Sequence, residues 1–157
     1  MILRGFRETD GPATLDVFRS AIRVTAARDY TPEQVAAWAS DDIDPAGWTA
    51  RRGSSRTQVA ELDDRVVGFT DVDETGYVDM LFVDPAFGRQ GVATALLEWA
   101  TATAQELGAT GLSTHASLTA RPFFEAHGFV VEAEEHPVLR GVELTNFVMR
   151  RSLSPRG

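Results

Sequence analysis

The sequence predicts an α+β fold built on a mostly antiparallel sheet. Three consecutive strand-like segments are joined by short turns, and segments with helical periodicity precede and follow them. The 157 residues contain no repeat and no linker-like stretch, and they are enough for one sizeable core. We therefore expect one domain over residues 1–153, followed by a short flexible tail, Ser154–Gly157.

The N-terminal part predicts a strand and then a helix. The strand covers Ile2 to Phe6, and Thr9 or Asp10 then supplies an N-cap ahead of Pro12 in the first helical turn. Apolar residues recur at helical spacing after this cap: Leu15, Phe18, Ile22 and Ala26. The helix should therefore bury one apolar face.

A second helix carries its own start signal. Thr31-Pro32-Glu33-Gln34 is a capping box with proline at the first helical position, so a short helix should run to about Ala39. The next segment, Pro45 to Arg52, is expected to be irregular or to form one helical turn.

The centre of the chain contains three predicted strands, Thr57–Leu62, Val66–Val72 and Tyr77–Val83. Asp63-Asp64 and Glu74-Thr75-Gly76 lie between them and supply turn residues. Because both connections are short, the three strands should form an antiparallel meander.

A long helix should follow the loop Asp84–Gln90 and end at Gly108. Its predicted buried face contains five residues at helical spacing: Val92, Leu96, Trp99, Thr103 and Leu107. This helix connects the last strand of the meander to the next strand along the chain.

The C-terminal part predicts a strand at Leu112–Ala116, a helix at Thr119–His127 stopped by Gly128, and two strands from Val130 to about Leu153. The sheet then has about seven strands and is flanked by about four helices. The strand–helix–strand unit from Tyr77 to Ala116 should form one parallel or splayed pair within it.

The composition restricts the class of function. Lys+Arg number 15 against 23 Asp+Glu, and the formal net charge of −8 disfavours nucleic-acid and membrane partners. No stretch approaches the roughly 18 apolar residues of a membrane span, and no apolar signal region opens the chain, so we expect a cytoplasmic protein. The absence of cysteine excludes disulfides, thiolate metal sites and a cysteine-borne acyl intermediate.

The segment with the strongest chemical pattern runs from Met80 to Ala100. A buried strand leads into a loop with Gly88 and Gly91, and the loop opens directly onto the long helix. Unpaired N–H groups and the helix dipole at such a place suit a pyrophosphate, and Arg89 adds a cation. A tight structural turn is the alternative. A nucleotide P-loop is disfavoured because no lysine follows the glycines, and GxGxxG is absent.

This segment resembles the acyl-CoA-binding motif of the GNAT superfamily of N-acetyltransferases, Q/R-x-x-G-x-G/A after a strand that ends in V-x-P. Val83-Asp84-Pro85 matches the end of the strand, and Gly91 and Ala93 match the fourth and sixth motif positions. The first position departs from the motif, because Gly88 stands where glutamine or arginine is usual.

A second segment, Ala116 to Phe129, resembles the helix N-x-x-A-x-x-F-Y-x-x-x-G-F of the same superfamily. The residues in register are Ser117, Ala120, Phe123 and Gly128-Phe129. The order of the predicted elements agrees as well, so the resemblance covers nearly the whole chain and is strongest to small bacterial members.

The resemblance implies a GNAT-like fold whose sheet splays between its fourth and fifth strands, with acetyl-CoA as the co-substrate in the gap. By position, the backbone N–H of Leu81 would bind the thioester carbonyl and stabilise the oxyanion, and that of Val83 would hold the pantetheine arm. Arg89 or Gln90 would compensate for Gly88 at the pyrophosphate. The other implied cofactor contacts are Gly91, Val92, Ala93, Thr94, Ser117, Phe123 and Phe124.

The implied reaction is direct acetyl transfer to an amine in a ternary complex. Asp79 and Tyr77 alternate with Leu81 along one strand, so they should share its face, and Asp79 is the candidate base. A structural carboxylate paired with a neighbour is the alternative for Asp79. The tyrosine that usually acts as general acid is replaced by Phe124. The open substitutes are Tyr30, Tyr77, His115 and water.

The expected acceptor is a small-molecule or peptide amine, cationic in character, bound between the first two helices and the final hairpin. Three aromatic residues and three carboxylates are candidates for this site: Tyr30, Trp38, Trp48, Asp29, Asp41 and Asp42. A place in the hydrophobic core is the alternative for the aromatic residues. Glu134-Glu135-His136 should be a solvated turn, and no metal is expected. A homodimer is left open. A non-catalytic acyl-CoA-binding or regulatory module is the alternative function.

Overall fold

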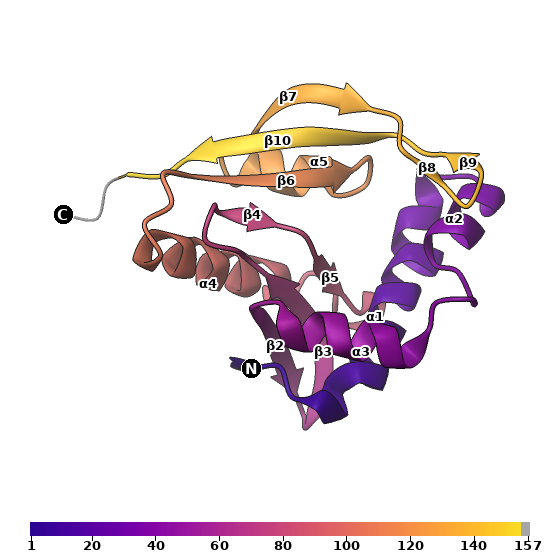
Figure 1. The fold of residues 1–157 in the computed structure, drawn as a ribbon, viewed down its shortest axis with the longest axis horizontal. Coiled ribbons are helices and arrows are strands. Elements are labelled where there is room, and N and C mark those ends of the chain that lie inside the picture. The colour runs from indigo at the N-terminus through magenta and orange to yellow at the C-terminus, as the bar shows by residue number, and fades with distance from the viewer. Residues whose placement is uncertain (155–157) are drawn as a thin grey trace.

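The computed structural model describes residues 1–154, so the expected tail lies outside the described residues except for Ser154. Two four-stranded sheets and a small hairpin form the β-structure (Figure 1). The first sheet has the order β1 (Ile2–Gly5), β2 (Thr57–Leu62), β3 (Arg65–Asp71) and β5 (Leu81–Val83). The second has the order β4 (Tyr77–Val78), β6 (Gly111–Ser117), β10 (Asn146–Ser152) and β7 (Val130–Glu135). The hairpin consists of β8 (Val138–Leu139) and β9 (Val142–Glu143).

Helices surround these sheets. The α-helices of the described residues are α1 (Gly11–Ser20), α2 (Pro32–Trp38), α3 (Pro45–Ser54), α4 (Val92–Glu106) and α5 (Arg121–Ala126). The end of α1 continues into a π-helical turn, Ala21–Thr25, and then a 3-10 turn, Ala26–Arg28. The predicted GNAT-like α+β architecture is confirmed, with its strands divided between two sheets.

The strand expected at Tyr77–Val83 belongs to both sheets. Its first part, β4, runs parallel to β6, with Tyr77 opposite Ser113. Its second part, β5, runs antiparallel to β3, with Leu81 opposite Thr70. The chain therefore crosses from one sheet to the other at Asp79 and Met80, and the sheets separate beyond that point (Figure 1). The predicted parallel or splayed pair is confirmed.

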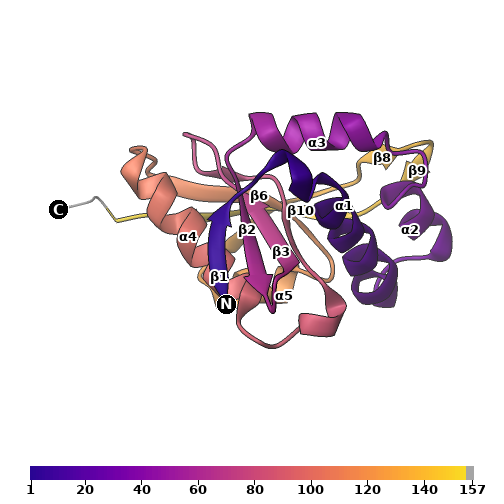
Figure 2. The same cartoon turned by 90° about the horizontal axis from the view of Figure 1, so that it is seen from below.

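Helix α4 packs against both sheets and fills the angle between them. Val92 and Leu96 pack on the first sheet with Ala60 and Val67. Farther along α4, buried residues pack on the second sheet in a core with β6, β10 and α5: Leu97, Ala100 and Ala104. Helices α1 and α3 cover the opposite face of the first sheet, through a core that includes Val59 and Phe69 (Figure 2).

This double contact corrects the predicted face of α4. Val92 and Leu96 are buried as expected, but Leu107 is 39% exposed and Trp99 is only partly buried. Helix α4 packs against two sheets that lie at an angle to each other. Its buried residues are therefore spread around the helix and do not lie on one straight face.

The capping box is confirmed at α2. At α1, Asp10 is the N-cap residue ahead of Pro12, as predicted, but its side chain does not cap the helix. Thr31 Oγ1 accepts a hydrogen bond from Gln34 N at 3.2 Å, and Gln34 Oε1 accepts one from Thr31 N at 2.9 Å. The carboxylate of Asp10, in contrast, binds the guanidinium of Arg4 through both oxygens at 2.8 and 2.9 Å. A bidentate charge-assisted contact is stronger than a cap to a neutral N–H, so Asp10 ties β1 to α1.

The expectation of an irregular segment or one helical turn at Pro45 to Arg52 is wrong. Helix α3 extends over ten residues, Pro45–Ser54, and Asp44 caps it by accepting a hydrogen bond from Gly47 N at 3.0 Å. Its composition is weakly apolar, and its buried residues are Trp48 and Arg52. Packing on the first sheet stabilises this helix, and the periodicity of its own sequence did not predict a helix of this length.

Gly76 sets the position of β4 beside β6, and its replacement should be costly. Gly76 has φ +84°, and an added Cβ would overlap the carbonyl oxygen of Gly111. Gly76→Ala should lower the free energy of unfolding by about 2–5 kcal/mol, from left-handed strain plus overpacking.

Gly108 is the matched control for this substitution. It has φ +87° and open space around an added Cβ, so Gly108→Ala should cost only about 1–2 kcal/mol of strain. Chemical denaturation of both variants measures the difference, and equal losses would contradict the overlap with Gly111.

Candidate active site

A pocket of about 270 Å³ opens where the two sheets separate. Its walls come from β5, β6, α5, the start of α4 and the π-helical turn. The lining residues are Ala21, Ile22, Thr25, Ala26, Trp38, Asp79, Leu81, Phe82, Val83, Ala93, Thr114, His115, Ala116, Ser117, Thr119, Ala120, Phe123 and Phe124. Asp79 is the only Asp, Glu, Lys or Arg side chain among them. The pocket is therefore mainly apolar, with one carboxylate at its edge.

Strand β5 directs two backbone N–H groups into this pocket. Asp84 N donates a hydrogen bond to Val67 O at 2.8 Å, so the backbone N–H of Asp84 faces β3. Because the direction of backbone groups alternates along a strand, the N–H groups of Leu81 and Val83 face away from β3. They face the gap that opens where β4 ends its pairing with β6.

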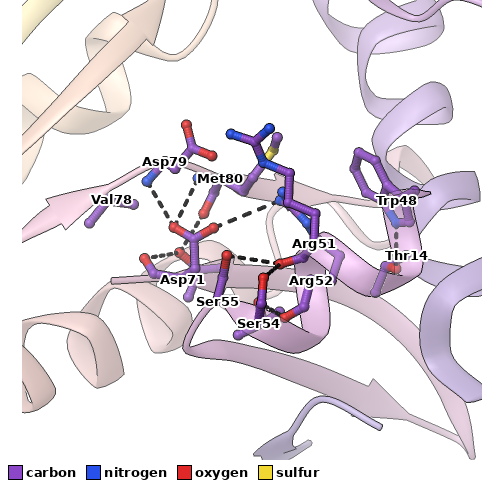
Figure 3. A network of polar contacts seen from close by, with 12 residues as sticks. Thr14, Trp48, Arg51, Arg52, Ser54, Ser55, Asp71, Val78, Asp79 and Met80 are labelled. Carbon is purple, nitrogen blue, oxygen red and sulfur yellow. Dashed lines mark hydrogen bonds and ion pairs between the residues drawn. The ribbon is translucent and has the colours of Figure 1, made fainter. Parts of the chain in front are cut away.

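The crossing at Asp79 and Met80 is held by the end of β3. The N–H groups of Asp79 and Met80 donate to Asp71 Oδ1 at 2.8 and 3.2 Å (Figure 3). Met80 O in turn accepts from Thr70 Oγ1 at 2.7 Å and from Asp71 N at 3.2 Å. The backbone between β4 and β5 is thus bound through both its donors and its acceptor.

The second oxygen of Asp71 faces a buried arginine. Arg52 Nη1 lies 3.8 Å from Asp71 Oδ2, which is an ion pair but too long for a hydrogen bond. The Arg52 side chain is 1% exposed, and its guanidinium lies over the ring of Trp48 at 4.7 Å. Burial raises the pKa of Asp71 to about 6, and burial lowers the pKa of Arg52. Desolvation therefore outweighs the mutual attraction of this pair.

Tyr77 lies beside the pocket and is hydrogen-bonded to His115. The distance from Tyr77 Oη to His115 Nδ1 is 2.8 Å, and His115 Nε2 lies 3.4 Å from Glu135 Oε1. Burial, and next the charge of Asp79, raise the pKa of Tyr77 to about 12. Tyr77 and Asp79 line an adjoining polar depression together, as their alternation along the strand predicted. Leu81 lies instead in the pocket, which Asp79 also borders.

The other phenol considered as an acid has a structural role. Tyr30 Oη donates to Thr145 O at 2.6 Å and accepts from Leu118 N at 2.9 Å, and burial raises its pKa. Phe124 is buried between the rings of Phe123 and Phe129 and borders the pocket. Tyr77 and His115 therefore remain as the candidate side chains for the general acid, because each has an exchangeable proton and lies near Asp79.

The glycine loop lies at the exposed start of α4. Gly91 is the N-cap residue with φ +79°, and no atom lies within 4 Å of an added Cβ. Gly88, Arg89 and Gln90 are exposed, whereas the side chain of Val92 is buried in the core, so Val92 can offer a ligand only its backbone.

The residues that follow the loop lead into the pocket. Ala93 lines it, and Thr94 Oγ1 lies 3.4 Å from His127 Nε2. At the other end of α5, Ser117 Oγ accepts a hydrogen bond from Ala120 N at 3.0 Å. Of the predicted cofactor residues, six line the pocket: Leu81, Val83, Ala93, Ser117, Phe123 and Phe124.

The predicted acceptor residues are only partly brought together. Trp38 lines the pocket, but Trp48 belongs to the core and donates to Thr14 Oγ1 at 3.0 Å, so its assignment as a wall is wrong. Asp29 accepts from Thr119 Oγ1 at 2.7 Å, and Asp41 pairs with Arg23 at 2.7 Å. Asp29 is therefore bound to a threonine that lines the pocket, whereas the partner of Asp41 lies outside it.

Two features of this site were not predicted from the sequence. The buried pair of Asp71 and Arg52 belongs to no sequence motif. A carboxylate at the end of an apolar strand is nevertheless a signal of a buried, paired charge. The π-helical turn that lines the pocket also went unrecognised, and π-turns are frequent at functional sites.

Residues 1–154 contain no cluster of three or more His, Cys, Asp or Glu side chains arranged to hold a metal. Within the same residues, no helix combines the length and apolar character needed to span a bilayer. Glu134 and Glu135, predicted in a turn, lie in β7, and His136 pairs with Glu134 at 3.0 Å.

Comparison with known proteins supports one family. The model for the acetyltransferase (GNAT) domain matches residues 26–151. The Escherichia coli (strain K12) protein named uncharacterized N-acetyltransferase YafP is 38% identical over 148 residues, which are 94% of this chain and 93% of that protein.

Solved structures agree with this match. A GCN5-related N-acetyltransferase (aminotransferase, class-II) from Rhodopseudomonas palustris has a TM-score of 0.93 at 33% identity, with 97% of this chain and 95% of that chain covered. The PaiA N-acetyltransferase from Thermoplasma acidophilum, solved with coenzyme A, has a TM-score of 0.78 at 17% identity and shares the fold, with coverages of 97% and 98%.

The buried Asp71 should make stability depend on pH. Its pKa is raised from 3.8 to about 6, so the folded protein binds more protons than the unfolded chain between these values. The contribution of Asp71 to the free energy of unfolding should therefore fall by about 2 kcal/mol as pH rises from 4 to 6. Chemical denaturation across this range should show the free energy of unfolding of the wild type falling with rising pH relative to that of Asp71→Asn, which has no carboxyl group at this position.

Asp10→Asn is the control with the opposite sign. The hydrogen bonds from Arg4 lower the pKa of Asp10, so its stabilisation is present at neutral pH and is lost as pH falls below 4. The same pH trend in both variants would contradict the assignment for Asp71.

Proposed function

The chain belongs to the acetyltransferase (GNAT) domain family, and from this premise we propose that it transfers the acetyl group of acetyl-CoA directly to an amine bound in the same pocket. The observation that carries the proposal is the place where β5 leaves β6. There the N–H of Leu81, the carboxylate of Asp79 and the path from the start of α4 meet. The proposed catalytic unit is a single domain over residues 1–153.

Coenzyme A would lie from the start of α4 to the pocket. The backbone amides of Gly91, Ala93 and Thr94 would bind the pyrophosphate, because the first N–H groups of a helix have no intrahelical partner. Val83 N–H would hold the pantetheine arm, and Phe123 would contact it from α5. The exposed Arg89 and Gln90 would add side-chain contacts where the family motif has its first polar residue.

Leu81 would stabilise the developing oxyanion. Its N–H faces the pocket and stands on a strand that is bonded to β3 on its other edge. A donor held in place before the reaction loses no reorganisation energy when negative charge forms on the thioester oxygen. The group needs no side chain, so any residue type at this position could supply it.

Asp79 would accept the proton of the attacking amine. It is the one carboxylate that borders an otherwise uncharged pocket, so it attracts a cationic ammonium group and takes its proton, and the neutral amine can then attack the thioester carbonyl. Direct attack fits a chain without cysteine, in which no thiol can carry the acetyl group. Tyr77, beside Asp79, would assist through its hydrogen bond to His115.

Phe124 leaves the departing thiolate without the usual tyrosine. A thiol has a pKa of about 8.5, so the thiolate can leave without obligatory protonation. A proton can reach it from the Tyr77 and His115 pair or from water. Trp38 and the π-helical turn would form the acceptor side of the pocket and favour an amine with an apolar body.

Release of free thiol from acetyl-CoA across a panel of amines tests the proposal. Amine-dependent release supports acetyl transfer, and panel members with one cation and an apolar body should be the best acceptors. Tight binding of CoA with no release for any amine would instead indicate the non-catalytic acyl-CoA-binding module.

Gly91→Asp should abolish CoA binding while leaving the fold intact. Open space surrounds this position, so the side chain fits at a cost of about 1–2 kcal/mol of strain for φ +79°, but its carboxylate would repel the pyrophosphate at the helix start. Calorimetric titration with CoA measures the loss, and Gly108→Asp at the far end of α4 is the control. Unchanged affinity in Gly91→Asp would contradict this placement of the cofactor.

Asp79→Asn should lower turnover by roughly 10²-fold with little change in CoA affinity, because an amide cannot take the proton. Glu74→Gln is the matched control, since it removes the same charge from the adjoining depression and lies outside the pocket. A fall of less than about threefold at saturating amine would assign Asp79 a structural role.

A further inference from the structure

We propose that Asp71 is a positioning residue that, together with Arg52, holds the Asp79–Met80 crossing in the geometry that acetyl transfer requires. The inference rests on the proposed function, because it concerns how Asp79 and the N–H of Leu81 are oriented. It assigns a role to two residues that lie outside the pocket and do not touch either substrate.

The two oxygens of Asp71 have different partners. Oδ1 accepts the N–H groups of Asp79 and Met80 at 2.8 and 3.2 Å, and Oδ2 faces Arg52 Nη1 at 3.8 Å (Figure 3). Each oxygen is therefore committed, and rotation of the carboxylate would break contacts on both sides. Asp71 itself is 5% exposed, so water cannot readily replace it as the acceptor.

These bonds act directly on the groups proposed for catalysis. The carboxylate binds the N–H groups of Asp79 and Met80, which belong to the two peptides on either side of Asp79. The next peptide carries the N–H of Leu81, and it is held through Met80 O by Thr70 Oγ1 at 2.7 Å and by Asp71 N at 3.2 Å. A small rotation of these linked peptides would turn the Leu81 N–H away from the thioester oxygen, and such donors act only within a narrow geometry.

Arg52 determines which way the carboxylate faces. Its guanidinium is buried against Trp48, and its Nε and Nη1 atoms have no hydrogen-bond partner among the described residues. The attraction of Asp71 Oδ2 is the favourable interaction that remains for Nη1. An apolar pair of similar volume would fill this space and remove both buried charges, but it would leave the N–H groups of Asp79 and Met80 without an acceptor. Packing alone therefore does not account for a buried carboxylate here.

Two double variants isolate the acceptor atom at position 71. Arg52→Met/Asp71→Asn removes both charges and leaves a neutral oxygen free to accept the crossing amides. Arg52→Met/Asp71→Leu has nearly the same shape but no acceptor. We expect the kcat of the first to stay within about threefold of the wild type and the kcat of the second to fall about tenfold to a hundredfold. CoA affinity should stay within about twofold in both, because α4 is untouched.

The single variant Asp71→Asn gives a second test. With Arg52 present, the one amide oxygen can serve either the guanidinium or the crossing amides, so kcat should fall, and the added Arg52→Met should restore it. Asp10→Asn is the matched control, because Asp10 is also about as buried, at 6% exposed, and also pairs with an arginine. Its kcat should not change.

Equal kcat in the two double variants would overturn the proposal, and so would an equal fall in Asp10→Asn or a parallel loss of CoA affinity. Hydrogen exchange of the Asp79 and Met80 amides adds a readout that does not need activity. Protection should drop at least tenfold in the Asp71→Leu double variant only. If the wild type acetylates no amine, the proposed function fails, and equal exchange in both double variants would then still reject the role of Asp71.

Discussion

A strand that passes from one sheet to another leaves backbone N–H groups without ladder partners at the crossing, and buried donors of this kind must be bound. In this protein the crossing is at Asp79 and Met80, and the acceptor is a carboxylate oxygen of Asp71. The pocket exists because β4 and β5 belong to different sheets. The separation of the sheets, and therefore the site, depends on how this crossing is satisfied.

The same arrangement separates the roles of neighbouring carboxylates. Asp71 is committed to the crossing, Asp73 accepts from the N–H groups of Thr75 and Tyr77, and Glu135 faces His115. Asp79 is left at the edge of an uncharged pocket. In a protein of net charge −8, long-range attraction brings cations to the surface, but the local environment decides which carboxylate can act on them.

Local signals predicted the elements that local interactions stabilise. The capping box of Thr31 and Gln34 identified α2, and the turn residues after Leu62 identified the end of β2. Helix α3 was missed because its burial comes from the sheet beneath it, and the stripe of α4 was misplaced because two sheets share it. Periodicity describes a face presented to one partner, and these helices do not meet that condition.

For the site, the sequence alone determined the family, the glycine loop at the start of α4 and the candidate pair Asp79 and Leu81, because these depend on chain-adjacent residues and backbone geometry. The tertiary structure alone decided that Trp48 belongs to the core, that Tyr77 contacts His115, and that Asp71 and Arg52 are buried together. Those contacts join residues far apart in the chain. Burial and pairing arise only when separate elements pack, and a linear pattern of residue types does not contain them.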